Sequence, residues 1–79
     1  MASIPLPDGK KLTENELIVL RLLLQGHTAG EVAEARGLTR WTIYDHMHRV
    51  HGKLGTHNVL QVRVRLKAMG LLDSVMEET

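Results

Sequence analysis

The chain has 79 residues, a formal net charge of +1 and no cysteine. This length supports one domain with one modest core and leaves no room for a cofactor cleft between lobes, which argues against an enzyme. Without cysteine, the fold relies on neither disulfides nor thiolate metal sites. No stretch approaches the ~20 apolar residues that a membrane span needs, and no signal-peptide pattern opens the chain. We therefore expect a cytoplasmic protein that binds no cofactor.

The charges are distributed unevenly along the chain. From Arg36 to Lys67 there are seven Lys or Arg residues and a single acid, Asp45. The other acids collect near the two ends of the chain and in the first two predicted helices. This asymmetry indicates one basic and one acidic face, as in proteins that bind nucleic acids. Chance clustering on a solvated surface is the alternative.

The two ends are predicted to lie outside a helical domain that occupies residues 12–72. Residues 1–11 contain two prolines and an Asp-Gly pair, which predicts an extended arm or turn without regular structure. Ile4 and Leu6 are expected to pin this arm to the core. Residues 73–79 are predicted to form a short acidic tail.

The first predicted helix begins after Thr13 and runs to Gln25. Thr13 and Glu16 have the spacing of a capping box, in which each side chain satisfies a backbone donor of the other residue. Residues 17–24 are apolar almost all round, which is more than one buried face requires. Either the arm or a partner is expected to cover the excess.

The next residues have the pattern of a helix-turn-helix. A second capping box begins at Thr28, and Ala33 lies four residues before Gly37. In this motif the small residue allows close helix packing, and the glycine adopts the positive φ of the turn. Leu38 is expected to fill the space beneath the turn, and Thr39 to cap the third helix.

The third predicted helix, residues 39–54, has an apolar inward face and an unusual outward face. The inward positions follow a spacing of three to four residues: Ile43, Met47, Val50 and Leu54. The outward positions are Trp41, Tyr44, Asp45, His48 and Arg49. A merely solvated helix would normally carry Glu, Lys and Gln there. We therefore predict that this helix lies in the major groove of DNA.

A fourth predicted helix, capped by Asn58, ends at Met69 and carries two apolar stripes. One stripe closes the core: Val59, Val62, Leu66 and Met69. The other stripe remains to be covered: Leu60, Val64 and Leu71. A homodimer through this helix would cover it and would predict an inverted-repeat operator. The alternative is a monomer in which the arm or the tail covers the stripe.

These residues resemble the LuxR-type (GerE-like) helix-turn-helix transcription regulators. The resemblance rests on Leu12-Thr13, Glu16, Val19-Leu20, Gly26, Glu31-Val32-Ala33, Thr42-Ile43, His46, Lys53-Leu54-Gly55 and Gly70-Leu71. It implies an all-α, four-helix domain that binds double-stranded DNA with its second and third helices and dimerises through its fourth. The chain departs from the family at several positions, including Arg36, where a core leucine is usual.

The resemblance also assigns individual positions on the third helix. The base-reading positions are Tyr44, Asp45 and His48. The phosphate-binding positions are Thr39, Arg40, Trp41, Thr42, Arg49 and Lys53. Asp45 either accepts a hydrogen bond from a cytosine amino group or is a solvated acid at the groove edge. Trp41 replaces a residue that is usually Lys-like, so it either stacks against the DNA backbone or packs on the second helix.

Other functions are weaker alternatives. A metal site at Asp45, His48 and His51 lacks a second ligand cluster in the sequence, and a Ser-His-Asp site lacks a framed nucleophile. An interaction module that binds RNA polymerase or another regulator through the apolar first helix is the principal alternative function. The initial methionine and the arm favour a free-standing regulator over a fragment of a sensor. The operator, the target genes and the sign of regulation do not follow from the sequence.

Overall fold

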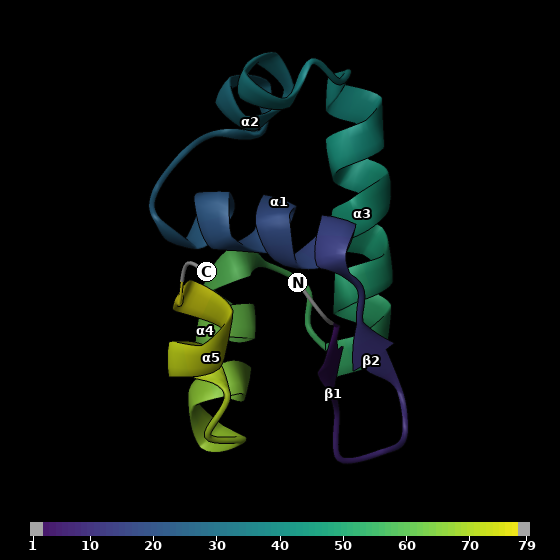
Figure 1. The fold of residues 1–79 in the computed structure, drawn as a ribbon, viewed down its shortest axis with the longest axis vertical. Coiled ribbons are helices and arrows are strands. Elements are labelled where there is room, and N and C mark those ends of the chain that lie inside the picture. Colours follow the sequence, from purple (N-terminus) through teal and green to yellow (C-terminus); the bar gives the residue numbers. More distant parts are fainter. Residues whose placement is uncertain (1–2, 78–79) are drawn as a thin grey trace.

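The computed structural model describes residues 3–77 and is predominantly helical. Two short strands precede the helices: β1 (Ile4–Pro5) and β2 (Lys11–Leu12). The helices are α1 (Glu14–Leu24), α2 (Ala29–Arg36), α3 (Arg40–Leu54), α4 (Val59–Ala68) and α5 (Leu72–Met76). Figure 1 shows α1 across the middle of the molecule, with α2 above it, α3 along one side and α4 and α5 below. The predicted helical fold class and its four helices are confirmed.

The helix starts lie where the capping residues predicted them. Thr13 and Thr28 each form a complete capping box with the glutamate three residues later. The Thr39 hydroxyl accepts a hydrogen bond from the Thr42 backbone, and Asn58 caps α4 through Gln61 in the same way. These bonds satisfy backbone donors that the first turn of a helix leaves free. Local sequence is therefore sufficient to start each of the first four helices.

The core lies around α1, which contacts every other helix. Each of the helices contributes completely or almost completely buried side chains. The largest fully buried side chains include Leu12, Leu17, Leu20, Val32, Ile43, Val50, Leu54, Val62, Leu66 and Val75. The predicted inward face of α3 is thus confirmed, and Val62 and Leu66 of the predicted core stripe of α4 are completely buried.

The N-terminal segment is a hairpin, so the prediction of an arm without regular structure is wrong for the residues described. Ile4 pairs with Leu12 and Pro5 with Lys11 in antiparallel register. The Leu6 backbone N–H donates to the Lys10 carbonyl at 2.7 Å, which closes the turn. Leu6 is buried, as expected. Two-residue strands are too short to produce a recognisable alternation in sequence. Residues 1–2 of the predicted arm lie outside the described residues.

The C-terminal segment is also structured, which corrects the prediction of an acidic tail. Leu72–Met76 form α5, and Val75 is completely buried. The Arg21 guanidinium of α1 donates to the Val75 carbonyl at 2.9 Å. Because α5 packs against α1, it covers part of the apolar excess of that helix. Residues 78–79 of the predicted tail lie outside the described residues.

Two further features concern the surface. Leu38 is 41% exposed, so it does not fill the space beneath the helix-turn-helix as predicted. The turn is held instead by the backbone, since the Leu38 N–H donates to the Ala33 carbonyl at 2.8 Å and Gly37 has a φ of 66°.

In residues 3–77, none of the helices has the length and apolar character needed to cross a membrane.

Candidate nucleic-acid interface

Helix α3 is held on one side and free on the other. Its core face is buried against α1 and α2: Ile43, Met47, Val50 and Leu54. On the opposite side, Trp41 is 83% exposed and Tyr44 is 56% exposed. Two large aromatic side chains exposed on one helix are costly to leave in water and are typical of a contact surface. The exposure of Trp41 also contradicts the alternative in which it packs on the second helix.

The three predicted base-reading residues lie together on this face. Tyr44, Asp45 and His48 are all exposed and occupy adjacent turns of α3. Asp45 also forms an ion pair with Arg49, in which Oδ2 lies 2.8 Å from Nη2. Both side chains are 57% exposed, so the pair is accessible to a ligand. The arrangement presents an aromatic hydroxyl, an imidazole and a coupled carboxylate and guanidinium.

The predicted phosphate-binding residues at the start of α3 directly follow the turn between α2 and α3. The Thr39 and Thr42 hydroxyls lie 3.2 Å apart. The Arg40 guanidinium lies against Gly30 of α2, where a Cβ atom would approach Nη2 to 3.0 Å. The glycine therefore leaves room for the guanidinium beside α2. Hydroxyl and guanidinium donors of this kind suit phosphate oxygens.

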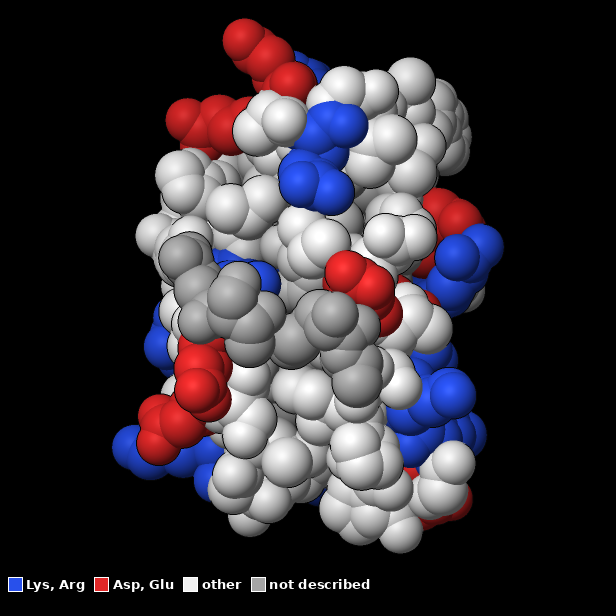
Figure 2. Space-filling model, in the orientation of Figure 1, with Lys and Arg blue, Asp and Glu red and all other residues white. Residues whose placement is uncertain are grey.

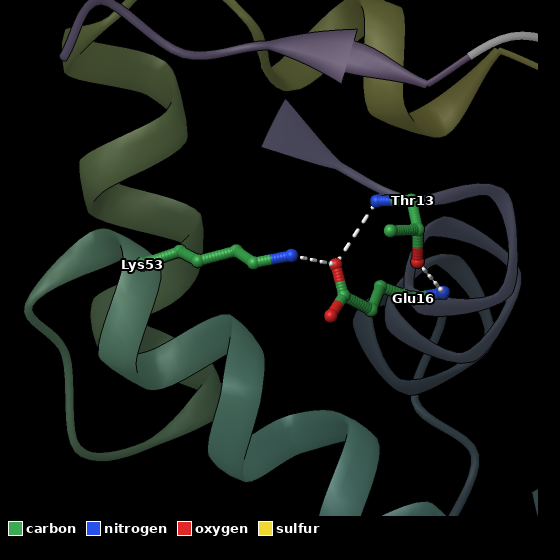
Figure 3. Close-up of polar contacts among 3 residues, drawn as sticks. All are labelled: Thr13, Glu16 and Lys53. Atoms are coloured by element: carbon green, nitrogen blue, oxygen red, sulfur yellow. Dashed lines mark hydrogen bonds and ion pairs between the residues drawn. The ribbon is translucent and has the colours of Figure 1, made fainter. Parts of the chain in front are cut away.

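Lys53 has a different environment from the other predicted phosphate-binding residues. Its Nζ lies 2.6 Å from Oε1 of Glu16, and the two side chains are only 24% and 3% exposed. Figure 3 shows Lys53 reaching across from α3 to the capping box of α1. The same Oε1 accepts the Thr13 backbone N–H at 2.9 Å. Lys53 thus joins α3 to the start of α1, and this geometry opposes the predicted phosphate contact.

The environment of Glu16 depends on this ion pair. Burial raises the pKa of the Glu16 carboxyl, but the hydrogen bonds from Lys53 and Thr13 outweigh burial, so the pKa lies below its ordinary value of 4.5. From the sequence, Glu16 is predicted as a capping residue, and its second partner, Lys53, is not predicted. The available signal was position, because Lys53 directly precedes the buried Leu54 and therefore lies at the border of the core face.

The histidines of α3 do not form a metal site within residues 3–77. No group of three or more His, Cys, Asp or Glu side chains in the described part of the chain is arranged to hold a metal ion. His51 Nδ1 lies 2.8 Å from the buried Thr56 hydroxyl. Burial lowers the pKa of His51 below its ordinary value of 6.5, and the nearby His57 and His48 lower it further. His51 is therefore part of the junction between α3 and α4.

Helix α4 retains an uncovered apolar stripe. Leu60 is 70% exposed and Val64 is 62% exposed, whereas Leu71 packs partly against the core. Neither the hairpin nor α5 covers Leu60 and Val64. Beside them runs a shallow groove lined by Gly55, Thr56, His57, Leu60, Gln61, Val64, Arg65 and Ala68. Arg63 is also a residue of α4, but its guanidinium donates to the carbonyl of Leu24 in α1 at 2.5 Å.

The balance of acidic and basic residues differs between α2 and α3. Figure 2 shows acidic side chains at the top of the molecule, over α2, and Lys and Arg side chains in the upper middle and on both sides, where some acidic side chains lie beside them. The acids of α2 include Glu31 and Glu34. Helix α3 carries Arg40, Arg49 and Lys53 and one acid, Asp45. The exposed face of α3 is therefore aromatic and carries the Asp45–Arg49 pair, because Lys53 is engaged by Glu16.

Comparison with known proteins agrees with this geometry. Residues 10–66 match the GerE family, described as bacterial regulatory proteins of the luxR family. No curated protein and no solved structure gives a significant match. The matched range contains the hairpin's second strand, the helix-turn-helix and most of α4, but not α5. The chain therefore belongs to the LuxR family of bacterial regulatory proteins and has the helix-turn-helix domain with which these regulators bind DNA.

Proposed function

We propose that the protein recognises specific sequences in double-stranded DNA by inserting α3 into the major groove. The observation that carries this proposal is the exposure of Trp41 and Tyr44 on the face of α3 opposite the core. The major groove is wide enough for one helix and presents a distinct donor and acceptor pattern for each base pair. Tyr44, Asp45 and His48 would read base edges.

Residues around the turn would fix the register of α3 on the DNA. Thr39, Arg40, Thr42 and Trp41 flank the start of the helix and would contact phosphates and sugars, which position a protein without reading sequence. Lys53 has less support in this role, because its ammonium is engaged by Glu16.

We further propose that two copies of the chain associate through α4. Leu60 and Val64 form an exposed apolar stripe that a two-fold interface would cover on both copies at once. Such a dimer would place two α3 helices about one DNA turn apart and would select an inverted repeat. Leu71 lies partly in the core and would contribute only its exposed edge.

The alternative function, an interaction module for RNA polymerase or another regulator, has lost its main argument. It rests on the apolar excess of α1, yet Leu17 and Leu24 are buried, and Leu22 and Leu23 are half-buried against the core. A contact with polymerase through α1 remains a prediction.

Selection of bound sites from a random DNA pool, followed by mobility shift across a salt series, tests the proposal. DNA binding that neutralises several phosphates weakens steeply as salt rises, whereas an apolar protein contact responds little. We expect a steep salt dependence and an enriched inverted repeat. An unshifted probe at low salt would favour the interaction module.

The dimer is tested separately by Leu60→Glu. We expect this variant to sediment as a monomer and to lose its preference for the inverted repeat over a single half-site. Glu34→Gln, which changes an exposed residue of α2 away from α4, is the control. A wild-type protein that stays monomeric on and off DNA would contradict the dimer.

A further inference from the structure

The ion pair between Asp45 and Arg49 lies at the centre of the exposed face of α3. The two residues are one helical turn apart, and Asp45 Oδ2 is 2.8 Å from Arg49 Nη2. Neither side chain contacts another element through a hydrogen bond or ion pair in residues 3–77. The pair is thus local to α3 and faces outward as a unit.

This pairing suits a phosphate contact poorly. A guanidinium bound to a carboxylate forms a unit with no net charge, and the carboxylate itself repels a phosphate. Neutralising phosphates is what raises the affinity of a cation for DNA, so an isolated arginine would serve that purpose better. The neighbouring Arg40, which makes no ion pair within the described residues, has the environment expected of a phosphate-binding arginine.

The same pairing suits a base edge. A guanidinium carries five donors in a planar fork, so Nη2 can donate to Asp45 while other N–H groups remain directed outward. Guanine presents two acceptors in the major groove, O6 and N7, that match this fork. The second oxygen of Asp45 remains free to accept a hydrogen bond from the amino group of a cytosine.

The surface beside the pair also permits close approach. Gly52 lies on the same outward face of α3, three residues after Arg49, and a Cβ built there would have no neighbour within 4 Å. Because glycine has no side chain, nothing at this position holds the helix away from the bases. A helix interior otherwise disfavours glycine by roughly 1 kcal/mol relative to alanine.

We propose that Arg49 reads guanine, and that Asp45 holds its guanidinium in the orientation required and accepts from a cytosine amino group of the same or the adjacent base pair. This assignment rests on the proposed insertion of α3 into the major groove. It moves Arg49 from the phosphate-binding residues to the residues that determine specificity.

The test uses the full chain and a DNA site selected from a random pool by the wild-type protein. Dissociation constants are measured for this site and for a set of sites in which each base pair is changed in turn, using the wild type, Arg49→Ala and Asp45→Asn. Glu34→Gln, which removes one exposed acid from α2, is the matched control for the change in charge. A second arm replaces the contacted guanine by 7-deazaguanine, which lacks the N7 acceptor.

We expect the wild type to discriminate by roughly 10- to 100-fold at one G·C pair. Arg49→Ala should abolish most of this discrimination, and Asp45→Asn should reduce it. The control variant Glu34→Gln should discriminate as the wild type does. With 7-deazaguanine, the wild type should lose affinity and Arg49→Ala should not.

Two other results would overturn the assignment, and they are distinguishable. If Asp45→Asn strengthens binding to all sites alike and Arg49→Ala weakens binding to all sites alike, Arg49 is a phosphate contact and the proposed function stands. If the wild-type protein selects no sequence and does not shift DNA at low salt, major-groove reading itself fails, and the assignment of Arg49 fails with it.

Discussion

Arg49 and Lys53 lie one turn apart on α3, yet their surroundings differ. Arg49 pairs with Asp45 on the same helix, and both side chains are more than half exposed. Lys53 pairs with Glu16 on α1, and the carboxylate is almost fully buried. From the sequence, both residues are cations on the second half of a basic helix.

The difference shows that burial of the partner decides the role of a cation. An exposed ion pair contributes little to stability and remains available to a ligand. If a cation leaves a buried carboxylate, the carboxylate stays buried without a charged partner, which is energetically unfavourable. One residue of α3 thus belongs to the surface, and its neighbour one turn later is anchored to a buried carboxylate of α1.

The largest expected effect is on folding stability. Lys53→Ala should lower the free energy of unfolding by about 2 kcal/mol, because Glu16 stays buried with one partner fewer. Arg49→Ala should lower it by less than about 0.5 kcal/mol, because its pair is exposed. Urea denaturation of both variants, with Lys67→Ala as a surface control, measures the difference. Equal losses for the two variants would remove the distinction between these residues.

The second prediction concerns salt dependence of DNA binding. Arg40→Ala should reduce the slope of log K against log salt concentration by about 0.9, the amount expected for one lost phosphate contact. Lys53→Ala should leave this slope unchanged at temperatures where the variant is folded. Mobility shift over a range of salt concentrations provides both slopes. A reduced slope for Lys53→Ala would show that its ammonium leaves Glu16 to bind DNA.

The third prediction is a dependence of stability on pH in two windows. The pKa of Glu16 is lowered by its hydrogen bonds against the effect of burial, so its contribution is complete above about 4.5 and is lost as the pH falls through the lower folded value. The pKa of His51 is lowered by burial, so protonation favours the unfolded state, and stability falls as the pH drops below about 6.5.

Thermal melts from pH 8 to pH 3 measure both windows. Glu16→Gln should flatten the acidic window, and His51→Gln should flatten the window below pH 6.5. The Glu16 window should be the larger, because that carboxylate is almost fully buried. Unchanged profiles for both variants would contradict these assignments.

The smallest expected effect is at Gly52. Gly52→Ala should raise the free energy of unfolding by roughly 0.5–1 kcal/mol, because alanine favours the helix and the space around it is open. In DNA binding the same change should be neutral or unfavourable, since it adds a methyl group to the contact face. Chemical denaturation and mobility shift of the same preparation separate the two effects. A destabilised variant would mean that Gly52 is required by the fold.

Much of the fold could be predicted from local patterns. The capping boxes at Thr13 and Thr28, the cap at Thr39 and the glycine at 37 define the first helices and the turn between α2 and α3. The four buried positions of α3 follow from helical spacing. The hairpin and α5 were not predicted, because two-residue strands and a single helical turn are too short to show a periodicity.

The candidate site was predicted less completely. The outward positions of α3 followed from their spacing, including the exposed Trp41 and Tyr44. The partner of Lys53 was not predictable in the same way, since Glu16 lies 37 residues away and already had a role as a capping residue. The helix-turn-helix pattern predicts that Leu38 fills the space beneath the turn, but the turn is held by backbone hydrogen bonds that do not need its side chain.

The sequence by itself determined where helices begin, which face of each is apolar and which family the chain resembles. These properties depend on residues within one or two turns of each other, so local hydrogen bonding and periodicity are sufficient to reveal them. Only the tertiary structure decided which charged residues are interior and which remain on the surface. That division depends on contacts between α1, α3 and α5, and whether a cation is buried depends on side chains that only folding brings beside it.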